Sequence, residues 1–175
     1  MGIAQRLVRQ SSKLRMSVRF RLPTLINFCM KTYTGYIEEL NPNQIFVFGS
    51  NTQGRHGAGT AKLCLNKYGA IYGQASGLQG KSYGLVTTNL TTYKFPSRSP
   101  EEVLTEIKKF YKCAEENPEL EFLVAYTAEG YNLCGYSSKQ LANLFSAVSI
   151  PENVIFEDKF AELINNSKYR NESVK

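Results

Sequence analysis

The sequence has a single histidine, and its four cysteines stand apart with no C-x-x-C pair. These residues lack the ligand spacing of a recognisable zinc site, so we expect neither a metal nor another cofactor. A chain of 175 residues can form a full hydrophobic core and does not need disulfides, which fits a reducing, cytoplasmic compartment. No apolar stretch approaches the roughly 20 residues that span a bilayer, so the composition predicts a soluble protein with no membrane partner.

Acidic residues are absent from residues 1–29, which carry six basic ones, whereas the rest of the chain holds fifteen of each sign. The net charge of +6 therefore belongs to this segment, which we expect to be disordered and to contribute nothing to the fold. Its Arg- and Ser-rich composition fits a mitochondrial transit segment. Met30-Lys31-Thr32-Tyr33 fits a natural start preceded by upstream sequence read in frame, and we favour this second interpretation. Nucleic-acid binding through the segment is an alternative function, which the neutral body disfavours.

The standard nucleotide-binding signatures are also missing. Gly80-Lys81-Ser82 resembles the end of a P-loop, but Ala75 stands in place of the first glycine and a strand pattern follows. The spacing of Gly54, Gly57 and Gly59 is not that of a G-x-G-x-x-G turn, and no serine lies in a G-x-S-x-G elbow. Any nucleotide site must therefore use other loops.

The stretch over residues 45–62 predicts such a loop. Four apolar, strand-favouring residues, Ile45-Phe46-Val47-Phe48, fit a strand buried on both faces. A polar segment with four glycines follows, and a helix pattern begins near Thr60. Glycines let backbone N–H groups approach an anion, and the helix N-terminus adds partial positive charge, so the stretch predicts a phosphate site.

Strand and helix patterns alternate along the body, which predicts a three-layer α/β/α domain over residues 30–166 with a mostly parallel sheet and mixed edges. Strands are expected over residues 45–48, 83–88, 122–127 and 153–156, with an edge strand within 33–40. Helices are expected over 58–68, 100–117, 137–147 and 160–165, the second starting at Ser99-Pro100-Glu101-Glu102. The stretch 74–82 is expected to be a connection, and 167–175 a frayed tail.

Two strand–loop–helix units, over residues 45–62 and 122–145, resemble the macro domain, a family that binds ADP-ribose. Asn51 matches the asparagine that ends the family's strand, Gly54 to Gly59 match its glycine-rich loop, and Thr127 to Tyr136 match its second loop. The motif F-G-S-N-x-x-G-R-H-G-x-G also resembles small bacterial and phage proteins. The resemblance covers about residues 33–165. It implies a macro-domain-like fold and a ligand, ADP-ribose or an ADP-ribosylated protein, held by two loops.

Three departures from the family's pattern bear on the chemistry. Its run of consecutive glycines, the acidic residue after them and its early aspartate have no direct counterpart in this sequence. The expectation is therefore wider: ADP-ribose or a related nucleotide-sugar diphosphate. Two forms of this function stay open, a hydrolase that cleaves an ADP-ribosyl bond and a reader without catalysis.

Each candidate residue has a functional and a structural role to decide between. His56 either makes a hydrogen bond that holds its loop, or it donates to the ligand and shuttles a proton. Glu129 is either an exposed loop carboxylate or the general base. Arg55 fits an anion clamp, and Asn51 a turn or a ribose contact. Cys64 and Cys113 are expected on buried helix faces and Cys134 in an accessible loop. The expected ligand-binding residues are Asn51, Gly54, Arg55, Gly57, Gly59, Thr127, Gly130, Tyr131 and Asn132.

Overall fold

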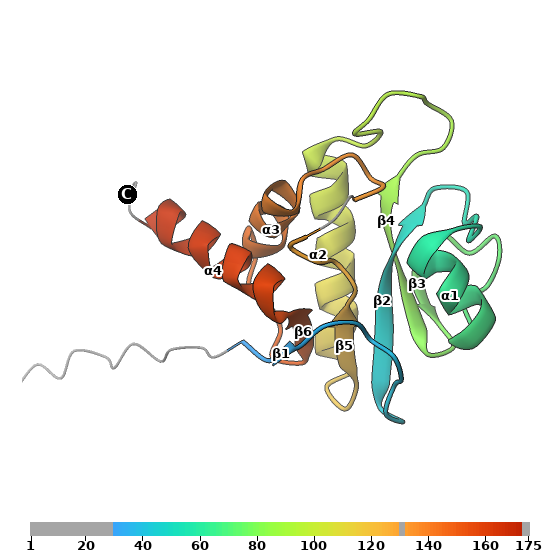
Figure 1. The fold of residues 1–175 in the computed structure, drawn as a ribbon, viewed down its shortest axis with the longest axis horizontal. Helices are drawn as coiled ribbons and strands as arrows, with labels where there is room; N and C mark the ends of the chain where they lie inside the picture. The colour runs from blue at the N-terminus through green and yellow to red at the C-terminus, as the bar shows by residue number, and fades with distance from the viewer. Residues whose placement is uncertain (1–29, 130–131, 173–175) are drawn as a thin grey trace, which may run out of the picture.

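The structure is a computed structural model (Figure 1), and it describes residues 30–129 and 132–172. The basic segment 1–29 lies outside these residues, and so do Gly130 and Tyr131 of the second loop. What the sequence predicts for them stays a prediction.

A six-stranded sheet lies at the centre of the described part of the chain, in the order β1-β6-β5-β2-β4-β3. Neighbouring strands are parallel except β3 and β4, which are antiparallel. This confirms an α/β fold with a mostly parallel sheet and one mixed edge. The strands are β1 (Thr32–Tyr33), β2 (Gln44–Asn51), β3 (Gly77–Gln79), β4 (Ser82–Thr88), β5 (Glu121–Val124) and β6 (Val154–Glu157).

Among the described residues, three helices lie between strands along the chain, and a fourth follows β6. They are α1 (Gly59–Lys67), α2 (Pro100–Glu116), α3 (Ser138–Ser146) and α4 (Asp158–Glu172). The predicted start of α2 is confirmed: the Ser99 side chain accepts from the backbone N–H of Glu102, whose side chain accepts from the N–H of Ser99. Ser137 and Gln140 form the same capping box at α3. None of the described helices is long and apolar enough to cross a membrane.

The last helix is longer than the sequence predicted. Helix α4 runs from Asp158 to Glu172, where a helix over 160–165 and a frayed tail were expected. Its sequence contains no glycine or proline, so nothing interrupts the hydrogen-bonded ladder once the first turns are anchored. Phe160, Ala161 and Ile164 supply that anchor, because all three are buried in the core.

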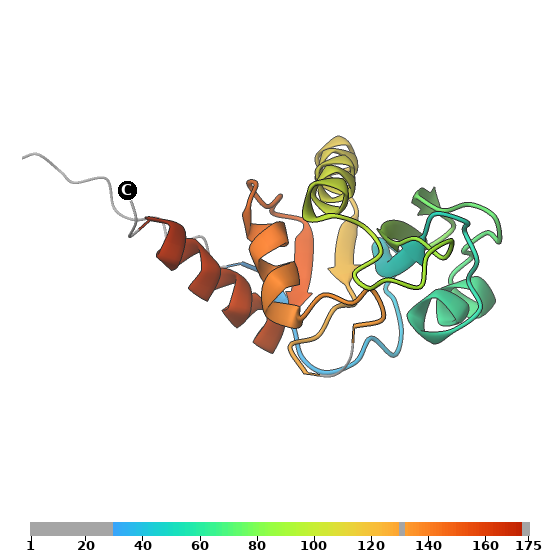
Figure 2. The same cartoon turned by 90° about the horizontal axis from the view of Figure 1, so that it is seen from above.

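Apolar side chains cover both faces of the sheet, in two separate clusters. On one face, Ile45 and Val47 of β2 join a large cluster with residues of α2, α3 and α4. On the other face, Phe46 and Phe48 pack against Ala61 and Cys64 of α1. Figure 2 shows α1 and α2 on opposite sides of the sheet. The run Ile45–Phe48 is therefore buried on both faces, as its composition predicts.

Strand boundaries differ from the predictions by more than one residue at four places. Strand β2 runs to Asn51, three residues past the predicted end at residue 48. The predicted edge strand is confined to Thr32–Tyr33, and residues 34–40 are irregular. Strand β5 ends at Val124, three residues earlier than expected. Strand β3 was missed, because it is only three residues long and lies in a stretch read as a glycine-rich connection. Its pairing with β4 depends on a close approach: a Cβ at Gly80 would lie 2.8 Å from the carbonyl oxygen of Tyr68.

Candidate functional site

Three neighbouring cavities lie where the parallel strands end. The loop after β2 and the long loop after β4 project from this end of the sheet (Figure 1). The first-loop cavity, of about 380 Å³, is bordered by the loop after β2. The central cavity, of about 240 Å³, shares Gly49, Thr88 and Leu133 with it, and the charged cavity, of about 310 Å³, shares Thr127 with the central one. The three therefore follow one another along the edge of the sheet.

Asn51 shapes the first-loop cavity through the backbone. Its side-chain amide donates to the carbonyl oxygen of Arg55 at 2.6 Å, and its side-chain oxygen accepts from the Arg55 N–H at 3.0 Å. These two bonds close the loop, so the turn-forming role of Asn51 is the one that the structure shows. Asn51 also lines the cavity.

Gly54 and His56, two predicted site residues, are buried within the loop and line none of the three cavities. The His56 ring is fully buried, with Nε2 3.1 Å from the carbonyl oxygen of Gln74 and its edge against Phe48. Gly54 accepts a hydrogen bond from the N–H of Gly73. Both residues fasten the loop to the segment around Gly73 and Gln74.

Gly57 and Gly59, by contrast, border the cavities at the N-terminus of α1. Gly57 lines the first-loop cavity and Gly59 the central one. The cap residue of α1, Ala58, offers no side-chain hydrogen bond, and the first turn holds no acidic residue. The backbone N–H groups of residues 57–61 make no hydrogen bond to any residue of the described ranges. The helix thus presents unpaired donors, and the positive end of its dipole, at the border of two cavities.

Arg55 supplies a side-chain cation to the first-loop cavity. The residue is exposed and lines the cavity, and its guanidinium makes no ion pair within residues 30–129 and 132–172. Ser50 lines the same cavity and is only 2% exposed, yet its hydroxyl has no partner in the described part of the chain. Unpaired donors of three kinds therefore meet at one cavity.

Hydroxyl and amide groups line the central cavity. Thr127 and Asn132, two of the predicted ligand-binding residues, both border it. Their side chains also make internal hydrogen bonds, Thr127 to the Glu129 carbonyl oxygen and Asn132 to the Ser138 hydroxyl. Cys134 lines it too but is 3% exposed, so the prediction of an accessible thiol was wrong. The loop turns inward here, and burial raises the pKa of the Cys134 thiol. Cys64 is buried as predicted, whereas Cys113 is half-buried.

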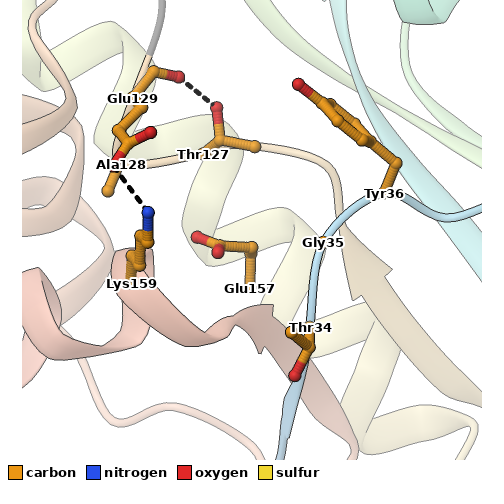
Figure 3. Close-up of a pocket in the computed structure, with 8 residues that line it drawn as sticks. All are labelled: Thr34, Gly35, Tyr36, Thr127, Ala128, Glu129, Glu157 and Lys159. Carbon is orange, nitrogen blue, oxygen red and sulfur yellow. Dashed lines mark hydrogen bonds and ion pairs between the residues drawn. The ribbon is translucent and has the colours of Figure 1, made fainter.

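Glu129 borders the charged cavity rather than the cavity of Arg55 (Figure 3). Its carboxylate accepts from Lys159 of α4 at 2.6 Å, and both side chains are exposed. The hydrogen bond and the charge of Lys159 hold the pKa of Glu129 below its usual value. A lowered pKa and a committed ion pair weaken Glu129 as a general base. None of the three cavities is lined by both Glu129 and His56, the predicted catalytic pair.

The ion pair can be tested by removing its cation. In Lys159→Ala we expect the Glu129 pKa to rise toward that of an ordinary carboxyl, measured by NMR titration of the side-chain carboxyl carbon. The sign follows from the lowered folded pKa: any stability from the pair is present above the ordinary carboxyl pKa and is lost as pH falls through the folded one. Lys108→Ala, an exposed lysine on α2, should leave the Glu129 pKa unchanged. The same Glu129 pKa in wild type and Lys159→Ala would mean that the pair does not form in solution.

Sequence reasoning missed the contribution of β4 and the loop that follows it. Thr88 borders two cavities, and Leu90 and Phe95 border the first-loop cavity. The signal was available, because a parallel strand next to β2 must end at the same edge of the sheet and place its loop beside the site. Leu133 of the second loop was missed as well, since only its polar and aromatic neighbours were considered.

Within the described ranges, no group of three or more His, Cys, Asp or Glu side chains could hold a metal ion. Comparison with models of protein families and with curated protein sequences finds no match to this chain, so the candidate site stands on its own geometry.

Proposed function

We propose that this protein binds ADP-ribose or a related nucleotide-sugar diphosphate along the three cavities. The observation that carries the proposal is the uncapped N-terminus of α1, which meets the unpaired guanidinium of Arg55 at the first-loop cavity. Backbone N–H groups at a helix N-terminus and a planar guanidinium are both suited to phosphate oxygens. The diphosphate would lie at this cavity.

The arrangement and lining of the three cavities support an elongated ligand. Each cavity shares at least one residue with the next, so a ligand longer than a single phosphate can extend from one to another. Hydroxyls of Thr87, Thr88 and Thr127 line the central cavity and can pair with sugar hydroxyls. The resemblance to the macro domain, carried by Asn51 and the two loops, supports a macro-domain-like fold and this ligand class.

The reader form of the function is the one that the geometry favours. No aspartate, glutamate or histidine among the described residues lines the first-loop or central cavity, and Glu129 is paired with Lys159 one cavity away. Tyr126 and Cys134 do line the central cavity, but burial raises the pKa of both. Release of ADP-ribose from an ADP-ribosylated protein by wild type would contradict the reader form. The rate of Glu129→Gln would then show whether Glu129 is the base.

Calorimetric titration with ADP-ribose, NAD and ATP tests the proposal. We expect ADP-ribose to bind wild type, and Arg55→Gln to weaken that binding by about tenfold to a hundredfold, the scale of one or two hydrogen bonds to a charged group. Arg55→Lys keeps the charge but loses the planar fork, so an intermediate loss is expected. Lys62→Gln, which removes an exposed cation from α1 away from the three cavities, should have little effect. Absence of binding by all three ligands would overturn the proposal.

A further inference from the structure

Three large exposed apolar side chains line the first-loop cavity. Leu90 is 46% exposed, Phe95 55% and Leu133 65%, and all three line the cavity. We call them the apolar lip. Leu90 and Phe95 come from the loop after β4, and Leu133 from the loop after β5, so two loops far apart in the sequence build it together.

Hydrogen bonds and close packing hold the lip in place. The hydroxyl of Tyr136 donates to the carbonyl oxygen of Arg98 at 2.6 Å, and the Arg98 guanidinium donates to the carbonyl oxygen of Val86 at 2.9 Å. The Cβ of Phe95 lies over Gly135: a Cβ added at that glycine would be 2.8 Å away from it. The two loops are thereby joined to each other and to β4. The lip is a formed surface, and a ligand need not order it.

The lip and the anion site border the same cavity, and Leu133 lies next to the start of α1, 3.8 Å from where a Cβ at Gly59 would be. The anion site, made by Arg55 and the N-terminus of α1, requires negative charge, whereas the lip offers no charge and no hydrogen-bonding side chain. A ligand that satisfies both carries a flat apolar group close to its phosphate. Nucleotides have this chemistry, because an aromatic base lies one sugar away from the phosphate.

We propose that the apolar lip receives an uncharged aromatic ring of the ligand, as the base of a nucleotide, beside the phosphate held at the first-loop cavity. This inference rests on the proposed function and adds an orientation to it. The base lies at the lip, and the opposite end of the ligand extends toward the charged cavity. There the carboxylates of Glu129 and Glu157 accept hydrogen bonds from sugar hydroxyls.

The test compares two phosphates that differ only by the base, AMP and ribose 5-phosphate, by calorimetric titration of the full chain. We expect AMP to bind wild type at least about fivefold more tightly, the lower end of what a stacked base contributes. The double variant Leu90→Ser/Leu133→Ser should bind both phosphates alike, with the affinity for ribose 5-phosphate unchanged. Both leucines are substantially exposed, so this variant is expected to fold. We expect Phe95→Ala, as a second and independent variant, to reduce the preference for AMP over ribose 5-phosphate.

Two control variants separate this lip from other aromatic surfaces. Tyr93→Ser changes a fully exposed residue of the same loop that does not line the cavity, and should leave the AMP preference intact. Tyr36→Ser changes an exposed tyrosine that lines the charged cavity, and should also leave it intact. Loss of the preference in Tyr36→Ser, with the lip variants unaffected, would place the base in the charged cavity and overturn the inference.

The remaining outcomes separate the inference from the proposed function. Equal affinities of wild type for AMP and ribose 5-phosphate would overturn the lip as a base site, and so would failure of AMP to bind. In either case a separate titration with ADP-ribose decides whether the proposed function stands. Binding of ribose 5-phosphate that weakens in Arg55→Gln, together with an AMP preference that the lip variants remove, supports both.

Discussion

Replacing Gly54 with alanine is expected to lower the free energy of unfolding by about 3 kcal/mol. Two costs add to give this figure. Gly54 has φ +64°, and a residue with a Cβ pays about 1–2 kcal/mol in the left-handed region. The added Cβ would also lie 2.5 Å from the carbonyl carbon of Gly73 and 2.8 Å from the backbone nitrogen of Gln74. Because the obstacle is backbone rather than a flexible side chain, relieving the overlap moves the segment that binds His56, at a cost of about 1–3 kcal/mol.

Urea denaturation followed by circular dichroism measures this loss. Gly57→Ala is the matched control three residues along the same loop. Gly57 has no positive φ, and no atom lies within 4 Å of where its Cβ would be, so its free energy of unfolding should change by less than about 0.5 kcal/mol. Equal stabilities of the two variants would show that the loop does not pack against residues 73–74 as described.

Gly57→Val should abolish most ligand binding while the protein stays folded. Valine at this position adds a branched side chain at the border of the first-loop cavity, beside the unpaired N–H groups at the start of α1. Loss of one or two hydrogen bonds from these groups to a phosphate, at about 1.5–3 kcal/mol each, predicts a fall in ADP-ribose affinity of about a hundredfold. Open space around the new Cβ predicts that the thermal midpoint changes little.

A size series at position 57 sharpens this measurement. Gly57→Ala should weaken binding less than Gly57→Val, because the obstruction grows with the side chain. Gly73→Ser is not a suitable control, since Gly73 has φ +92° and would report backbone strain. Thr60→Val changes an exposed residue of the first turn of α1 that lines the central cavity. This variant tests whether the loss of ADP-ribose affinity is local to the first-loop cavity. Unchanged ADP-ribose affinity in a folded Gly57→Val protein would remove this cavity from the binding site.

Much of the fold could be read from local pattern, because its causes are local. The run Ile45–Phe48 has the composition of a strand buried on both faces, and the structure buries all four side chains. Ser99 and Glu102 accept hydrogen bonds from each other's backbone N–H, and Pro100 has no N–H to satisfy, so α2 begins here whatever lies nearby in space. Prediction failed where an element depends on contact with another segment. Strand β3 forms only because β4 lies beside it, and α4 continues past residue 165 because its first turns are buried in the core.

The site was predictable as a place but not residue by residue. Parallel strands ending in polar loops are enough to place it at the carboxyl edge of the sheet. Which way a loop side chain points is a different matter, since it depends on what packs behind the loop. Arg55 and His56 are adjacent, yet one is exposed at the cavity and the other is fully buried against Gln74.

The amino-acid sequence by itself determined the alternation of strands and helices, the buried centre of the sheet and the end of the sheet at which the candidate site lies. These depend on hydrophobic period, capping residues and glycine spacing, which act over a few residues. Only the tertiary structure decided which residues share a cavity. Gly54 meets Gly73, Glu129 meets Lys159, and Phe95 meets Gly135. Those partners are 19, 30 and 40 positions apart in the sequence, and no local pattern records the contacts that folding creates between them.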